Sequence, residues 1–142
     1  MHGADLTATL EAITETAEKV TPDALCTVSV YEAETNTLHH VAGMRLPQDY
    51  LSAKRRLEIG PRNGSCAAAI FLHRQVIVAE ITRDALWEHL RAPAVEAGLR
   101  ACWSTPVRAS DGRMLGTVAL YFRQPRSPLR RDFELMGRLT AL

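Results

Sequence analysis

The alternation of apolar and polar residues is most regular between Leu99 and Phe122, where the chain reads LRACWSTPVRASDGRMLGTVALYF. This pattern predicts two long strands. Asp111-Gly112 predicts the hairpin turn between them, because glycine accepts the positive φ that primed turns require. In the first strand Trp103 points to one face and Cys102 to the other. Both faces carry apolar side chains, so we expect a sheet that is covered on both faces.

Shorter β-rich runs occupy residues 25–31 (LCTVSVY), 38–44 (LHHVAGM) and 76–81 (VIVAEI). Asn36 lies between the first two runs and suits a turn, so they predict a second hairpin. Residues 57–59 predict a short extended piece before Gly60-Pro61.

The N-terminal segment, residues 5–20, predicts an amphipathic helix. Its apolar residues recur at spacings of four and three and form a narrow stripe: Leu6, Leu10, Ile13, Ala17 and Val20. A stripe of this width fits the seam of a helix bundle. Thr21-Pro22 ends the helix, because proline disfavours helical geometry in the residue before it.

Helices are also predicted in the middle of the chain, over residues 47–56, 66–73, 85–90 and 93–97. Ser65 is the expected N-cap of the helix over 66–73, whose three alanines allow close packing on the sheet. These helices connect strands, so they are candidates to cover one sheet face.

A final helix is predicted after Ser127-Pro128, with serine as N-cap and proline in the first helical position. It has two apolar faces, one formed by Leu129, Phe133, Met136 and Thr140 and the other by Leu135, Leu139 and Leu142. One face can cover the sheet and the other can meet a partner. We therefore expect a homodimer through the terminal helices, the alternative being that both helices only close the domain's own core.

Composition indicates one domain of 142 residues, 46% of them apolar. We divide it into an N-terminal helix (1–22), a sheet region (23–125) and the start of a C-terminal helix (126–142).

A net charge of +1 with interspersed signs makes nucleic acid and an anionic membrane surface poor partners. No apolar run reaches the ~20 residues of a membrane span, and the N-terminus lacks the order of a signal peptide, so we expect a cytoplasmic domain. The three cysteines fit reduced thiols.

The candidate binding chemistry centres on Gly64, Ser65 and Cys66. A helix start offers free backbone amides and suits a carboxylate, phosphate or nitrate-like ligand, the alternative being an ordinary serine cap. At the start of a helix, an exposed Cys66 would have a lowered thiol pKa. The alternative is that Cys66 is a buried, inert residue. Trp87 and Trp103 are candidate walls of a pocket, and the alternative is that both are plain core residues.

Catalytic and metal-binding signatures are sparse. The sequence contains no GxSxG, P-loop or HExxH motif and no metal-ligand spacing. His39 and His40 are neighbours on a strand and point to opposite faces, so they cannot chelate one ion. Haem bound through His73 or His89 is an alternative to the simpler expectation of surface histidines. The sequence identifies no cofactor.

Three segments together resemble a GAF domain: IGPRNGSCAAAIF at 59–71, VIVAEITRDALWEHLRAPAVEAGLRACWSTPV at 76–107 and GRMLGTVALYF at 112–122. They are most similar to the subgroup with a G-x-G-S-C-G signature and an ACWS-P strand, found in bacterial sensor kinases and cyclic-di-GMP turnover proteins. The chain departs from that subgroup at Arg62-Asn63, where one glycine is usual, and at Ala67, where glycine usually follows the cysteine.

The resemblance implies an α+β fold, with an antiparallel sheet of five or six strands and the terminal helices on one face. A ligand pocket would lie on the other face, between residues 66–73, residues 85–97 and the sheet. The implied function is a non-catalytic sensory module for an unidentified small molecule, attached to an effector domain in a sensor histidine kinase or cyclic-di-GMP enzyme.

Two alternatives stay open at this point. One is a thiol enzyme resembling free methionine sulfoxide reductase, since Cys66 falls where that family keeps a cysteine, although residues 81–97 lack its Cys-Asp pair. The other is a ligand-free dimerisation module.

Overall fold

The computed structural model describes residues 3–43 and 45–141, with the backbone alone for residues 3–7. Within these residues six strands form one antiparallel sheet in the order β3-β2-β1-β6-β5-β4. The strands are β1 (Leu25–Glu32), β2 (Thr37–Ala42), β3 (Arg56–Glu58), β4 (Val76–Val78), β5 (Ala101–Arg108) and β6 (Met114–Phe122). The expected antiparallel sheet is confirmed. Met44, the expected end of the second β-rich run, lies outside the described residues.

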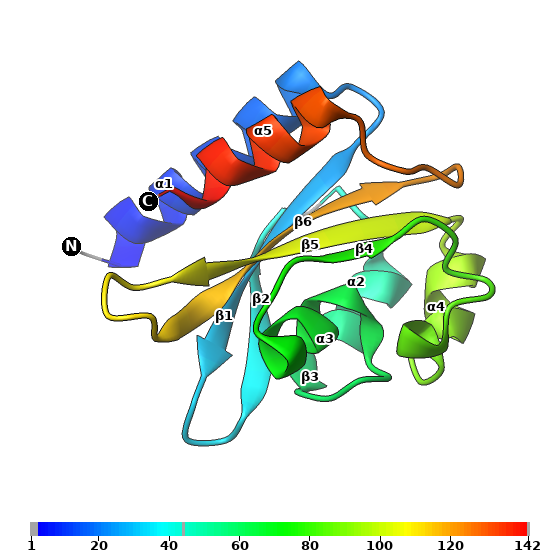
Figure 1. The fold of residues 1–142 in the computed structure, drawn as a ribbon, viewed down its shortest axis with the longest axis horizontal. Coiled ribbons are helices and arrows are strands. Elements are labelled where there is room, and N and C mark those ends of the chain that lie inside the picture. Colours follow the sequence, from blue (N-terminus) through cyan, green and yellow to red (C-terminus); the bar gives the residue numbers. More distant parts are fainter. Residues whose placement is uncertain (1–2, 44, 142) are drawn as a thin grey trace.

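The helices are α1 (Gly3–Val20), α2 (Gln48–Lys54), α3 (Gly64–Leu72), the 3-10 helix η1 (Ala85–Trp87), α4 (Arg91–Glu96) and α5 (Arg130–Thr140). Figure 1 shows α1 and α5 side by side across one face of the sheet, with α2, α3 and α4 on the other face. Each face has its own buried apolar cluster, so the sheet is the middle of three layers. None of the described helices combines the length and the apolarity needed to cross a bilayer.

The β5–β6 hairpin has the expected strands but a longer connection. The expected primed turn at Asp111-Gly112 is wrong, because the strands end at Arg108 and Met114 and only Gly112 in the connection has a positive φ, 88°. The Ala109 N–H donates to the Arg113 carbonyl over 2.8 Å, so the loop is closed by a hydrogen bond between its first and last residues.

The α1 stripe packs on the sheet of its own domain. Leu10 and Ala17 are buried in the cluster shared with α5, and Ile13 is partly buried against it. Val20 at the end of α1 is 57% exposed. The expected stripe member Leu6 lies outside the described side chains.

The last helix, α5, begins at Arg130 rather than after Ser127, so the expected serine cap is wrong. The N-cap is Leu129, whose N–H donates to the Asp132 carboxylate over 2.8 Å. Leu135 and Leu139 are buried, and so is Met136, which was expected on the other face, whereas Phe133 is 45% exposed. Leu142, expected on the same face as Leu135 and Leu139, lies outside the described residues.

Candidate ligand site beneath helices α2 and α3

The start of α3 is held by the side chain of Ser65. The expected role of Ser65 as N-cap is wrong, since the helix begins at Gly64 with Asn63 at the N-cap position and no side-chain cap. Ser65 instead lies within the first turn and is buried. Its hydroxyl donates to the Cys102 carbonyl over 3.1 Å and accepts a hydrogen bond from Trp87 Nε1 over 3.0 Å. Ser65 therefore links α3 to β5 and to η1.

Side chains from the η1–α4 segment cover this helix start. A Cβ added at Gly64 would lie 3.0 Å from Leu90 Cδ2 and 3.5 Å from the Trp87 ring. The structure thus brings Gly64, Ser65, Cys66 and Trp87 together, as the sequence predicts. Ligand contact at their amides stays a prediction.

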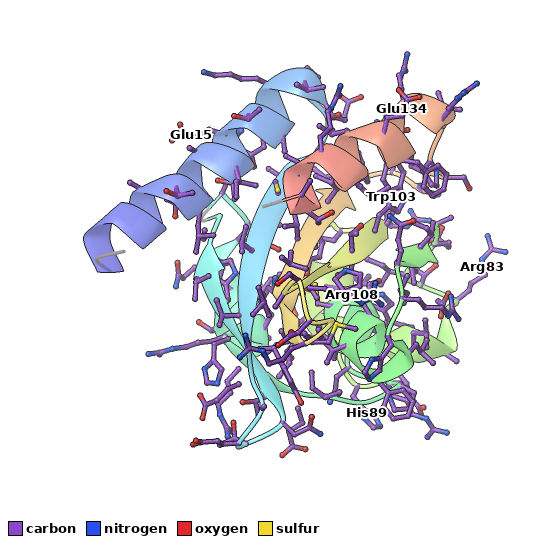
Figure 2. All side chains as sticks on the ribbon, turned by 60° about the vertical axis from the view of Figure 1, so that its left-hand side comes forward. Glu15, Arg83, His89, Trp103, Arg108 and Glu134 are labelled. Carbon is purple, nitrogen blue, oxygen red and sulfur yellow. The ribbon has the colours of Figure 1, made fainter. Side chains whose placement is uncertain are left out.

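Trp103 does not share this location. Alternation along β5 directs Trp103 to the opposite face from Cys102, into the cluster beneath α1 and α5. Its Nε1 donates to the Arg126 carbonyl over 3.0 Å, and Figure 2 shows it beside α5. Trp103 therefore cannot line a pocket with Trp87, and that part of the predicted site is corrected.

Three aromatic residues take the place expected for a pocket wall: Tyr50, Trp87 and Tyr121. The rings of Tyr50 and Trp87 are stacked with centroids 6.5 Å apart, and Tyr121 meets both edge-on. The hydroxyls of Tyr50 and Tyr121 are hydrogen-bonded at 2.9 Å. Burial raises the pKa of both tyrosines well above 10.0, so the phenols stay neutral.

Lys54 is the residue of this region that sequence reasoning missed. It is the last residue of α2, four positions after Tyr50, and shares the buried helix face with Tyr50 and Leu51. Its side chain is only 1% exposed. Nζ donates to Thr27 Oγ1 over 3.0 Å and lies 5.1 Å from the Tyr121 ring centroid. The available signal was this four-residue spacing within a short helix.

The sheet beneath Lys54 presents small polar side chains at its centre. Thr27 on β1 and Ser104 on β5 both pair with Ala119 on β6, so the three residues form a row across the central strands. Thr117 lies two residues before Ala119 and points to the same face. Each of the three hydroxyl-bearing residues is at most 1% exposed. We call Lys54, Thr27, Ser104, Thr117 and Cys66 the polar chamber.

Cys66 is the acidic group of the polar chamber. Hydrogen bonding by the Cys102 thiol lowers the Cys66 pKa against the opposing effect of burial, and the Lys54 charge with the Ser104 and Thr117 hydroxyls lowers it further. Cys102 keeps its proton, because burial and then the neighbouring Cys66 raise its pKa. Cys66 is therefore buried, as one of the two alternatives held, but its environment favours the thiolate.

His40 on β2 lies on the chamber's side of the sheet, paired with Ser29 of β1. Burial and then the positive charge of Lys54 lower the pKa of His40 from 6.5 to about 4. The imidazole is therefore neutral at physiological pH, and protonating it would place a second positive charge near Lys54.

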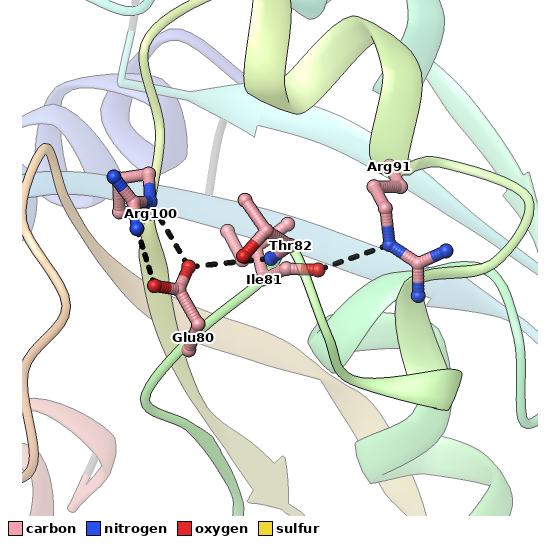
Figure 3. A network of polar contacts seen from close by, with 5 residues as sticks. All are labelled: Glu80, Ile81, Thr82, Arg91 and Arg100. Atoms are coloured by element: carbon pink, nitrogen blue, oxygen red, sulfur yellow. Dashed lines mark hydrogen bonds and ion pairs between the residues drawn. The ribbon is translucent and has the colours of Figure 1, made fainter.

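Ion pairs and hydrogen bonds fix the segment that carries Trp87 (Figure 3). The Glu80 carboxylate receives two hydrogen bonds from the Arg100 guanidinium and one from the Thr82 N–H. The Arg100 hydrogen bonds are the main cause that lowers the Glu80 pKa to about 2. Arg91 Nε donates to the Ile81 carbonyl over 3.2 Å. This network ties the chain after β4 to α4 and to Arg100, the residue before β5.

Metal binding finds no support among the described side chains, which contain no group of three or more His, Cys, Asp or Glu that could hold an ion. His73 and His89 are exposed, and Figure 2 shows His89 at the end of the molecule away from α5. The candidate site is thus defined by buried hydrogen-bonding and charged groups that lie beside a cluster of aromatic side chains.

The sequence as a whole matches the family model described as "GAF domain" over residues 3–142. The chain belongs to the GAF domain family. A curated relative, the methyl sulfide methyltransferase-associated sensor of Methanosarcina acetivorans, is 31% identical to this GAF domain over 134 residues. The match covers 94% of the chain and only 13% of the relative, so the chain spans a small part of that protein's length.

Solved structures share the fold of this GAF domain. One is a domain of a two-component sensor histidine kinase protein of Sinorhizobium meliloti, with a TM-score of 0.75 and 14% identity over 94% of this chain and 85% of that one. Another is the free methionine-R-sulfoxide reductase of Neisseria meningitidis in complex with its substrate. It has a TM-score of 0.73 and 18% identity over 94% of this chain and 72% of that one. At these identities the likeness extends to the fold alone, which serves a sensor protein in one case and an enzyme in the other.

Proposed function

We propose that this GAF domain is a non-catalytic sensory module that binds a small molecule between the sheet and helices α2, α3 and α4. The observation that carries the proposal is the polar chamber itself, because buried polar groups normally satisfy one another or a bound molecule. A region that served only as a core would be expected to be apolar at the centre of the sheet. The sensor named among the relatives adds support.

A screen of small molecules tests this proposal. In a Trp103→Phe background, Trp87 is the one remaining tryptophan, and its indole contacts Ser65 beside the chamber. A ligand is expected to change Trp87 fluorescence and raise the melting temperature together, with saturation at one equivalent. A broad panel of metabolites that produces neither change would contradict the proposal.

The rival enzyme reading is a free methionine sulfoxide reductase, favoured by the solved reductase structures and by the contact between Cys66 and Cys102. All three cysteines of the chain are buried, which speaks against a catalytic thiol open to substrate. Incubation with free methionine sulfoxide and a thiol reductant decides between the two. We expect no turnover, and turnover lost in Cys66→Ser would replace the sensory proposal.

We further propose that α1 and α5 transmit the signal. The domain would dimerise through these helices, and α5 would continue into an effector domain of a sensor kinase or cyclic-di-GMP enzyme, in the cytoplasm. Supporting this, exposed apolar residues occur at the end of α1 (Val20), at the N-cap of α5 (Leu129) and on α5 itself (Phe133). Ligand binding would then shift the packing of the helices against the sheet. The alternative of a ligand-free dimerisation module would share this dimer and fail the ligand screen.

We also propose, on the sequence motifs, that the domain belongs to the GAF subgroup with the G-x-G-S-C and ACWS-P signatures. Ser65, Cys66 and Cys102 belong to those signatures and meet at the chamber. Arg62-Asn63 and Ala67 are its departures from the subgroup, and both lie near the start of α3.

A further inference from the structure

Lys54 is buried without a carboxylate partner. Among the described side chains no Asp or Glu forms an ion pair with it. Nζ has three protons to donate, and its hydrogen bond to Thr27 Oγ1 uses one of them. Lysine is almost never fully buried unless it is paired, because removing an ammonium group from water is costly. The Tyr121 ring, 5.1 Å away, offers only a weaker attraction.

The sheet surface near Lys54 holds further unused hydrogen-bonding groups. The hydroxyls of Ser104 and Thr117 are buried and face the Cys66 sulfur, whose pKa they lower, but among the described residues neither meets a partner at full hydrogen-bonding distance and angle. Strand register places Ser104 and Thr27 on either side of Ala119, with Thr117 one side-chain step along β6. Ala119 has the smallest side chain of this row, and the hydroxyls, the ammonium group and the Cys66 sulfur lie around it.

We propose that Lys54, Ser104 and Thr117 form a site for a small oxyanion, such as a carboxylate, nitrate or phosphate, with Lys54 as the counter-charge. The inference rests on the proposed sensory function and names its ligand class. The ammonium group supplies positive charge and donors, and each of the two hydroxyls can rotate to donate a hydrogen bond, so with Cys66 protonated the three groups complement a small oxyanion. Lys54, Ser104 and Thr117 are each at most 1% exposed, and Tyr50, Trp87 and Tyr121 pack against one another beside them, so we infer a ligand with few non-hydrogen atoms.

Cys66 provides a built-in reporter of this binding. Its thiolate is the internal negative charge that can balance Lys54, and the Lys54 charge is one of the causes that lower the Cys66 pKa. An anion bound at Lys54 cancels that charge and repels the thiolate. Binding is therefore accompanied by uptake of a proton at the Cys66 sulfur, and the ultraviolet absorbance of the thiolate decreases.

The test is a calorimetric titration of the whole chain with acetate, nitrate and inorganic phosphate, with chloride as a reference. The chain has two lysines, and Lys19 is exposed on α1, so Lys19→Met is a matched control for Lys54→Met. We expect at least one oxyanion to bind saturably, with affinity unchanged in Lys19→Met and reduced about tenfold or more in Lys54→Met. Comparing the three anions shows whether a carboxylate or an inorganic oxyanion is preferred.

Equal affinity in Lys54→Met, or no binding of any oxyanion to the wild-type chain, overturns the inference. If Lys54→Met does not fold, the double variant Ser104→Ala/Thr117→Val takes its place and must also weaken binding. A neutral molecule that binds and quenches Trp87 would refute the anion site while leaving the sensory function intact. Methionine sulfoxide turnover would instead refute the sensory function.

Discussion

The indole nitrogen of Trp87 donates a hydrogen bond to the hydroxyl of Ser65 over 3.0 Å, and Ser65 in turn donates to the Cys102 carbonyl over 3.1 Å. Both side chains are buried, so neither group can turn to water. The two bonds join η1, α3 and β5 at one point, directly beside the polar chamber. This relationship explains why a serine stands at a helix start that it does not cap.

Replacing Ser65 by alanine tests this connection. Ser65→Ala leaves the buried Trp87 N–H without a partner, so we expect the free energy of unfolding to decrease by about 1–3 kcal/mol. Urea denaturation followed by far-ultraviolet circular dichroism measures the change. Ser110→Ala, in the exposed β5–β6 loop, is the matched control. Equal stability of the two variants would show that the Trp87–Ser65 bond contributes nothing.

The neutral His40 predicts a dependence of stability on pH. Its folded pKa of about 4 lies below the ordinary value of 6.5. Between these values the unfolded chain binds a proton that the folded chain excludes, so stability decreases as the pH falls from 6.5 toward 4. From pH 7 to pH 5 we expect His40 to account for a loss of about 1–2 kcal/mol.

Chemical denaturation of His40→Leu and wild type at both pH values measures this contribution. His89, whose side chain is exposed, supplies the control His89→Gln. The His40 variant should lose less stability on acidification than either reference protein. A parallel pH dependence in all three would mean that His40 is not the group responsible.

Much of the fold could be predicted from the sequence, because it depends on local pattern. The 99–122 hairpin, the terminal helices and the covered faces of the sheet all follow from residue periodicity. The opposite orientation of Trp103 and Cys102 was also evident. Which of those faces α3 covers is not determined by the local pattern, so the sequence alone places Trp103 on the wrong side of the sheet.

The polar chamber could not be predicted, because it depends on tertiary packing. Lys54 is followed by Arg55 and Arg56, both exposed, and nothing local separates the buried cation from its neighbours. Its burial follows from the way α2 turns its Tyr50 face toward the sheet. The role of Ser65 likewise depends on Trp87, which arrives from a segment 22 residues away in the chain.

The network around Glu80 should control the mobility of the segment that carries Trp87. Glu80→Gln removes the charge that receives two Arg100 hydrogen bonds, so we expect faster hydrogen exchange over residues 79–90. Exchange in α1 and α5, on the far face, should not change. Glu88→Gln, which alters the exposed pair with Arg62, is the control. Unchanged exchange over 79–90 would show that the network does not restrain the segment.

The exposed apolar side chain of Phe133 on α5 predicts self-association. Leu10 is a poor probe of it because it lies in the domain's own core, whereas Phe133 is 45% exposed. We expect a dimer in sedimentation equilibrium at tens of micromolar, and a folded monomer for Phe133→Glu. Arg130→Glu, at a fully solvated position of the same helix, controls for added negative charge. A wild-type monomer at every concentration would refute the dimer.

Native mass spectrometry of the protein as purified from cells detects directly whether the polar chamber holds a ligand. We expect a non-covalent small molecule of defined mass on the wild-type and Lys19→Met chains, released on denaturation and absent from Lys54→Met. If folded Lys54→Met carries the same bound molecule as the wild-type chain, the polar chamber is not the binding site. A chain with no bound molecule, and no response to the small-molecule screen, would contradict the sensory function itself.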